Sequence, residues 1–256
     1  MSQSPEEGFL DLPTRPLKPR SVGLSHVLDR GTPLAAFAGT VEAVAAFADI
    51  WKFGWGTAYI DPSVAEKVEI LRDHGVLACP GGTLVEIASQ LGRTDRLLRW
   101  AADLGFTALE VSNGAIEMST SEKRTLIAKA AREFVVLSEV GSKDPEAVLS
   151  PDAVEVEAQG DLEAGARWVV LEGRESGTVG LYDREGQVRE DLVEHVAVSA
   201  GLEKIVFEAP LKDQQAWFIR RFGPGVNLGN VPPENVLGLE TLRLGLRADT
   251  IALLGR

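Results

Sequence analysis

The sequence contains few of the residues that form disulfides or zinc sites. It has one cysteine, Cys79, and three scattered histidines, His26, His74 and His195, among 256 residues. One cysteine excludes a disulfide within the chain and a metal site built from several cysteines. The histidines do not have the spacing of zinc ligands. The sequence therefore gives no sign of a disulfide scaffold or a zinc centre.

Basic residues and long apolar runs are also scarce. There are 26 lysines and arginines against 38 aspartates and glutamates, a formal charge of −12. Nucleic acids and anionic membranes need a basic surface, so neither is expected as a partner. No apolar run approaches the roughly 20 residues of a membrane span, and the acidic first ten residues do not resemble a signal peptide. We therefore expect a soluble, cytoplasmic protein.

The hydrophobic pattern predicts an α/β fold, a single (β/α)8 TIM barrel. Four prolines predict a non-regular arm at residues 1–20, and the barrel domain is predicted at 21–256. Within it, short runs rich in Val, Ile, Leu and Phe alternate with amphipathic stretches, as in parallel strands buried on both faces. We predict strands at 23–29, 50–53, 76–79, 108–112, 135–139, 168–172, 205–208 and 226–229. We predict helices at 34–48, 64–74, 95–104, 122–134, 153–164, 192–200, 214–222 and 236–246. A doubly wound open sheet is the alternative arrangement.

Charged side chains stand near the carboxyl ends of most predicted strands, where barrel enzymes hold their active sites. Alternation along residues 108–112 turns Leu109 and Val111 toward the helices and Glu110 toward the barrel axis. Such carboxylates repel one another unless cations lie among them, and oxygen ligands suit Mg²⁺ or Mn²⁺. Alternatively, each glutamate caps a helix or pairs with a surface arginine. The polar residues that the pattern brings to one end of the barrel are Asp29, Lys52, Glu110, Glu139, Glu172, Glu208 and Asn227.

Glycine-rich loops follow three of these strands. Residues 53–57 (FGWGT) directly follow Lys52. Residues 79–84 (CPGGTL) lead into a helix whose first amides could bind an anion, and residues 172–180 (EGRESGTVG) add Arg174. Glycine also closes such turns for steric reasons alone. With Lys52 and Lys143 nearby, the loops favour a phosphate or carboxylate ligand. Lys143, just past the fifth predicted strand, could act as a general acid or base, although an exposed loop lysine is more often only solvated.

Two further polar side chains lie on the predicted strands. His26 has apolar neighbours, which favours a hydrogen-bonded histidine in the core or at an interface. Cys79 has no histidine close to it in sequence, which favours a buried, unreactive thiol. We therefore assign neither residue to the chemistry.

A series of motifs resembles the phosphosulfolactate synthase family. The motifs run in order over nearly the whole chain after the arm. They are KPR at 18–20, KFGWGT at 52–57, PGGTL at 80–84, EVSNG at 110–114, SEVGSKD at 138–144, EGRESG at 172–177, FEAP at 207–210, QQAW at 214–217, FGPGVNLGN at 222–230 and GLETLRLGLR at 238–247, followed by DT at 249–250.

The resemblance implies a (β/α)8 barrel, a homo-oligomer and a lyase that forms a C–S bond. The implied reaction is the Mg²⁺-dependent addition of sulfite to phosphoenolpyruvate, giving (2R)-2-O-phospho-3-sulfolactate, an early step toward coenzyme M. The chain departs from the family pattern in two places. Gly225 stands where we expect an asparagine, and Ser25-His26 stands where a threonine and an apolar residue are more usual.

Residue pattern and resemblance together give an expected site. Lys143 and Lys52 are expected to be catalytic, with Lys143 as the proton donor. Glu139 and Glu172 are expected to face Mg²⁺, with Glu110 and Glu208 as alternates. The residues expected to bind the substrates, phosphoenolpyruvate and sulfite, are Arg20, Gly81, Gly82, Thr83, Asn113, Arg174, Ser176, Gly177, Asn227 and Asn230.

Two other functions fit the same residues. One is a related enzyme that keeps the Mg²⁺ and enolate chemistry but uses another nucleophile or acceptor. The other is a non-catalytic, stress-related protein built on the same barrel, as in plant heat-stress relatives. The intact set of lysines and glutamates argues against the second.

Overall fold

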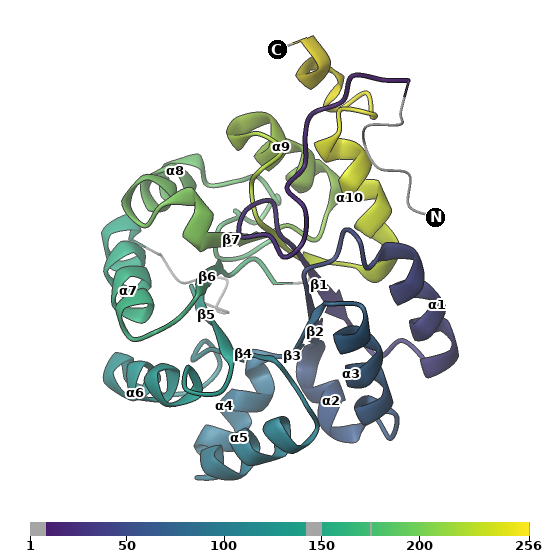
Figure 1. Ribbon diagram of the computed structural model, residues 1–256. Coiled ribbons are helices and arrows are strands. Elements are labelled where there is room, and N and C mark those ends of the chain that lie inside the picture. Colours follow the sequence, from purple (N-terminus) through teal and green to yellow (C-terminus); the bar gives the residue numbers. More distant parts are fainter. Residues whose placement is uncertain (1–8, 142–149, 175, 256) are drawn as a thin grey trace.

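Eight parallel strands surround a common axis, and helices form a ring outside them (Figure 1). The computed structural model describes residues 9–141, 150–174 and 176–255. Hydrogen bonds join the strands in the order β3-β2-β1-β8-β7-β6-β5-β4. The strands are β1 (Ser25–Asp29), β2 (Ile50–Phe53), β3 (Leu77–Pro80), β4 (Ala108–Val111), β5 (Val135–Val140), β6 (Trp168–Leu171), β7 (Ile205–Glu208) and β8 (Leu228–Val231).

The ring closes between β3 and β4 through one residue. The Thr107 amide donates to the Ala78 carbonyl at 3.1 Å, and the Ala78 amide donates to the Thr107 hydroxyl oxygen at 3.0 Å. These contacts bring the two ends of the sheet together. The predicted barrel is therefore confirmed, and the open sheet is not formed.

Helices follow each strand. The predicted helices are found with ends shifted by a few residues. A helix, α4, begins at Gly82, where residues 79–84 were expected to lead into one, and α2 is an additional helix. The helices are α1 (Leu34–Val44), α2 (Thr57–Ile60), α3 (Val64–Asp73), α4 (Gly82–Gln90), α5 (Thr94–Asp103), α6 (Thr120–Ala130), α7 (Pro151–Glu163), α8 (Glu190–Ser199), α9 (Lys212–Phe222) and α10 (Val236–Arg243). Short 3-10 turns lie at Gly54–Gly56, Leu202–Lys204, Pro233–Asn235 and Ile251–Gly255. None of the helices in the described residues is long and apolar enough to span a membrane.

The alternation of side chains along the strands divides the core into two parts. Side chains such as Trp51 and Phe207 point outward and pack under the helices in the larger cluster. Side chains such as Ile50, Leu137 and Val170 point inward and fill the barrel. Two residues further along the same strands, the inward-facing side chains are charged. This apolar filling supports the polar layer at the carboxyl ends.

The described part of the arm is bound to the other end of the barrel. Residues 9–24 form no helix or strand. Lys18 Nζ donates to the Ala45 and Ala48 carbonyls at 2.8 and 2.7 Å, at the carboxyl end of α1. Arg15 pairs with Glu240 of α10 at 2.9 Å. Cations that bind the last carbonyls of a helix stabilise it, so the arm is part of the scaffold.

Candidate active site

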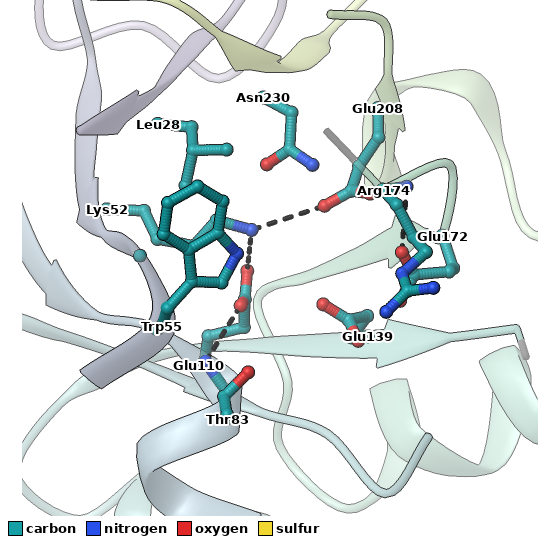
Figure 2. A pocket seen from close by; sticks show the side chains of 13 residues that line it. Leu28, Lys52, Trp55, Thr83, Glu110, Glu139, Glu172, Arg174, Glu208 and Asn230 are labelled. Carbon is teal, nitrogen blue, oxygen red and sulfur yellow. Dashed lines mark hydrogen bonds and ion pairs between the residues drawn. The ribbon is translucent and has the colours of Figure 1, made fainter. Parts of the chain in front are cut away.

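A cavity opens at the carboxyl ends of the strands, and we call it the mouth. Figure 2 shows its lining side chains converging from several strands. Ten residues expected in the site line it, together with Leu28 and with Gly54 and Trp55 of the glycine-rich loop at 53–57. The lining residues are Leu28, Lys52, Gly54, Trp55, Gly81, Gly82, Thr83, Glu110, Glu139, Glu172, Arg174, Glu208 and Asn230.

Lys52 lies at the base of the mouth between two carboxylates. Its Nζ is 3.0 Å from Glu110 Oε2 and 3.2 Å from Glu208 Oε1, and all three side chains are buried. Burial opposes the charge on Lys52, but Glu110, Glu208 and Glu139 outweigh it and raise the lysine pKa well above its ordinary value. Lys52 is therefore a fixed positive charge at neutral pH.

Backbone amides hold the two carboxylates that flank Lys52. The Gly82 amide, at the start of α4, donates to Glu110 Oε1 at 3.0 Å. The amides of Gly173 and Arg174 both donate to Glu208 Oε2 at 2.8 Å. Burial raises the pKa of Glu110, and Glu139 and Glu208 add to this rise, while Lys52 opposes it. Both oxygens of Glu110 and of Glu208 are thus occupied by protein donors.

Glu139 and Glu172 lie on the opposite side of the mouth from Trp55 (Figure 2). Glu139 belongs to β5, and Glu172 follows β6 directly. The Arg174 amide donates to Glu172 Oε1 at 2.8 Å. The electrostatic effect of Glu139 on both Lys52 and Glu110 places it in the same charged group. The mouth therefore unites charges from β2, β4, β5, β6 and β7.

Three lining residues have a left-handed backbone. Trp55, Arg174 and Asn230 have φ of 52°, 55° and 53°, and they are the non-glycine residues with positive φ in the part of the chain described. Such residues are strained by about 1–3 kcal/mol and concentrate at functional sites. Asn230 is 3% exposed, and its Oδ1 has no hydrogen-bond partner among the described residues. Buried amides normally have partners, so Asn230 suits a ligand in the mouth.

Two residues expected to bind substrate lie at the opposite end of the barrel. Arg20 pairs with Asp49, just before β2, with Nε 3.1 Å from Oδ1. Asn227 precedes β8, where its side chain accepts from the Leu24 amide at 3.0 Å and donates to the Ile205 carbonyl at 3.0 Å. Their expected place in the mouth was wrong. Both residues instead bind groups at the amino-terminal ends of strands.

Other expected residues lie outside the lining. The side-chain amide of Asn113 donates to the Met118 carbonyl at 3.2 Å, and the Ser176 hydroxyl accepts a hydrogen bond from the Thr178 hydroxyl at 3.0 Å. Gly177 packs against Gln214 of α9, which donates to its carbonyl at 2.8 Å. Asp29 points outward and accepts from the Gly31 amide at 2.9 Å. Local structure thus accounts for these four residues.

Lys143, the expected proton donor, lies outside the described residues. It follows β5 by three positions, and β5 itself carries Glu139 into the mouth. Its role stays a prediction.

His26 and Cys79 are both fully buried. The thiol of Cys79 donates to the Pro80 carbonyl at 3.3 Å, and burial raises its pKa well above the ordinary value, as expected of an unreactive thiol. Neither ring nitrogen of His26 has a hydrogen-bond partner among the described residues, so the expected hydrogen-bonded core histidine is not found. Burial, and then Lys52, lower the His26 pKa well below its ordinary value, so the ring is neutral.

Three lining residues were not named as site residues: Leu28, and Gly54 and Trp55 of the glycine-rich loop at 53–57. Alternation along β1 places Leu28 on the inner face with His26, a signal that the sequence contains. The position of Trp55 depends on its left-handed backbone, which hydrophobic spacing does not reveal.

The donor set of the mouth fits a hard divalent cation. Four carboxylates and two basic side chains line it, an excess of two negative charges when all are ionised, and the lining contains no histidine or cysteine. Among the described residues, three ligand atoms lie within 4.8 Å of one another only at Asp152, Glu155 and His195, outside the mouth. Magnesium often takes one or two carboxylates and completes its shell with water and substrate oxygens. The mouth suits that mode of binding.

Comparison with known proteins identifies similar chains. The model of the (2R)-phospho-3-sulfolactate synthase family matches residues 13–249. The phosphosulfolactate synthase of Methanothermobacter thermautotrophicus is 45% identical over 245 residues, which cover 93% of this chain and 95% of the relative. That of Bacillus subtilis is 40% identical over 250 residues, covering 95% and 98%. The solved 3-hexulose-6-phosphate synthase of Salmonella typhimurium has a TM-score of 0.56 at 15% identity, covering 88% of this chain and 100% of that one. An identity this low shows the fold alone.

Proposed function

The chain belongs to the phosphosulfolactate synthase family, and we propose that its mouth joins sulfite to phosphoenolpyruvate with the help of a bound magnesium ion. The observation that carries the proposal is the family match over residues 13–249 together with a mouth that holds carboxylates, the buried Lys52 and the half-buried Arg174. Enzymes with this activity make (2R)-2-O-phospho-3-sulfolactate.

The mouth offers separate places for the anionic groups of the substrate. Phosphoenolpyruvate carries a phosphate and a carboxylate, and both need local positive charge in a protein of charge −12. The start of α4 supplies the positive end of a helix dipole and the amide of Thr83, since the Gly81 amide donates to the Phe53 carbonyl and the Gly82 amide to Glu110. Arg174 supplies a guanidinium on the other side (Figure 2). We place the phosphate and the carboxylate between these two groups, with Asn230 as a further contact.

The addition forms one carbon–sulfur bond and one carbon–hydrogen bond. The sulfite sulfur donates a lone pair to the methylene carbon, and the electrons of the double bond move to the carbon that bears the phosphate and the carboxylate. The negative charge spreads into that carboxylate until a proton reaches the carbon. Lys52 is a poor proton donor because its pKa is raised, but its fixed charge stabilises the increasing negative charge. Lys143 is the proposed proton donor.

Glu139 and Glu172 are the carboxylates that we propose for the metal, because both line the mouth, while Glu110 and Glu208 are the ion-pair partners of Lys52. When bound there, Mg²⁺ would supply positive charge to the substrate carboxylate. Substitution of either glutamate by glutamine keeps its shape and removes its charge. We expect Glu139→Gln and Glu172→Gln each to raise the Mg²⁺ concentration needed for half-maximal activity, and Glu86→Gln, at a buried residue outside the mouth, to leave it unchanged.

A phosphorus NMR assay with phosphoenolpyruvate, sulfite and Mg²⁺ tests the reaction. We expect a new phosphoester signal that depends on sulfite and disappears when a chelator removes the metal. Lys143→Ala should abolish the signal without changing the fold. No new signal from the wild-type protein would contradict the proposed function, and a signal with another nucleophile from a panel would support the related enzyme instead.

Assembly and compartment are also proposals. The side chains of Phe9, Leu17 and Ile251 are exposed at the arm and the last helical turn, which supports a homo-oligomer. Light scattering on the purified protein measures its mass and would contradict this proposal by giving the mass of one chain. The charge and the single cysteine support a cytoplasmic enzyme, and the resemblance supports a role toward coenzyme M. Fractionation of the source cells and a search for labelled product test the two proposals.

A further inference from the structure

Trp55 occupies its place in the mouth at an energetic cost. It lies in a Gly-Trp-Gly turn after β2, with φ of 52° and ψ of 27°. A bulky residue in this conformation is strained, and its side chain is still 51% exposed. Neither backbone preference nor burial of the indole explains a tryptophan here. The stability of the free protein therefore does not account for a tryptophan in this turn.

Trp55 and Leu28 form one side of the mouth, and we call this pair the apolar wall. Figure 2 shows the two side chains next to each other, facing Glu139, Glu172 and Arg174 across the cavity. Gly54 lets the turn pack closely on Leu28, because a Cβ at Gly54 would lie 2.7 Å from Leu28 Cδ1. They are the large apolar side chains among the described lining residues. The mouth therefore has the two large apolar side chains on one side, beside Lys52, and Glu139, Glu172 and Arg174 on the other.

Phosphoenolpyruvate has the same division. Its phosphate and carboxylate are anionic, and its methylene group is apolar. We propose that Trp55 determines specificity by holding the unsubstituted methylene end of the substrate against the apolar wall, an inference that rests on the proposed function. The charged groups of the substrate then face the opposite side, and the reacting carbon lies between Trp55 and the sulfite.

The apolar wall also limits the size of the substrate. A methyl group on the reacting carbon, as in (Z)-2-phosphoenolbutyrate, would meet the indole. One methylene changes discrimination in an apolar pocket by about 10- to 200-fold. The wild-type enzyme should therefore prefer phosphoenolpyruvate to this analogue by a ratio in that range.

Two substitutions separate the wall from the backbone. Trp55→Gly removes the indole from the wall, leaves Leu28 in place and fits the left-handed backbone without strain, so it should fold. Trp55→Phe keeps an apolar ring in the same backbone. Tyr59→Ala is the control, because Tyr59 is a neighbouring aromatic residue, 70% exposed, that contacts Trp100 and does not line the mouth.

The measurement is kcat/KM for the two substrates, at fixed sulfite and Mg²⁺, with dissociation constants from calorimetry. We expect Trp55→Gly to lower the preference for phosphoenolpyruvate by at least about 10-fold. We expect Trp55→Phe to retain most of the preference and Tyr59→Ala to retain all of it. An unchanged preference in Trp55→Gly, or an equal loss in Tyr59→Ala, would overturn the inference.

Failure of the proposed function gives a different result. If the wild-type protein turns over neither substrate, that function is wrong, and the dissociation constants alone decide the role of Trp55. A wild-type preference in binding that Trp55→Gly removes supports the apolar wall even then. Equal binding of both compounds by the wild-type protein overturns it.

Discussion

Lys52 is a cation enclosed by acidic side chains from other strands. Its partners Glu110 and Glu208 belong to β4 and β7, so the three side chains tie separate parts of the barrel together. Isolated charges are unstable when buried, and each of these groups depends on the others. The pairing therefore contributes to the fold as well as to the chemistry.

Replacement of Lys52 by methionine should destabilise the barrel and abolish activity. The change leaves two buried carboxylates without their cation, which costs about 3–5 kcal/mol of unfolding free energy. Urea unfolding of both proteins measures this difference. Lys212→Met is the control, because Lys212 also pairs with two carboxylates but is exposed, and it should have no measurable effect.

The same comparison predicts a pH dependence. Folding raises the Lys52 pKa above its ordinary value of 10.5, so its stabilising effect is complete below that value and is lost as the pH rises through the raised pKa. The stability difference between wild type and Lys52→Met should be constant from about pH 7 to about pH 9 and shrink above pH 10.5. A difference that shrinks already between pH 7 and 9 would be inconsistent with a raised pKa.

Asn227 should affect stability and leave substrate binding unchanged. Asn227→Ala leaves the buried Leu24 amide without its acceptor, at a cost of about 1–3 kcal/mol. Because Asn227 lies at the amino-terminal ends of the strands, KM for phosphoenolpyruvate should stay at the wild-type value. Unfolding experiments and steady-state kinetics check the two parts. A large rise in KM would indicate instead that Asn227 contacts the substrate in the mouth.

At the scale of elements, the start of α4 packs closely against β4. A Cβ at Gly82 would lie 2.9 Å from Ser112 Cβ and 3.2 Å from Glu110 Oε1. Gly82→Ala should therefore displace Glu110, lower kcat/KM and destabilise the fold by about 1–3 kcal/mol. In contrast, Gly39 lies within α1 with nothing near its Cβ position, so Gly39→Ala should stabilise the protein by about 0.5–1 kcal/mol. Thermal unfolding and kinetics of both variants test the pair, and equal effects would contradict this packing.

The elements show what sequence patterns can and cannot predict. Strands β2 and β7 were predicted with the bounds that the structure has, because each is a short run of buried side chains with a charged residue at or next to its carboxyl end. Strand β8 was predicted two residues too early, because Val226 before it is buried as well. That shift placed Asn227 in the mouth. The expected position of Arg20 was wrong because the KPR motif at 18–20 does not show which end of the barrel these residues contact.

At the scale of the whole molecule, the net charge opposes the approach of anionic substrates. The chain carries −12, and the mouth gathers its cations within an acidic protein. Moderate salt screens long-range repulsion more than buried contacts, since the Debye length is about 10 Å at 0.1 M. We expect kcat/KM for phosphoenolpyruvate to rise as NaCl increases to about 0.1 M at constant free Mg²⁺. A steady fall would mean that local cations dominate the approach of the substrate.

The junction at Thr107 has a consequence for how the molecule fluctuates. Paired strands elsewhere in the barrel share ladders of backbone hydrogen bonds, whereas β3 and β4 meet through Thr107 and Ala78. Transient opening of a closed cylinder begins where separation breaks the fewest bonds. Deuterium should therefore enter the amides flanking this junction sooner than those of β6 or β7, even though β4 is as fully buried as those two strands.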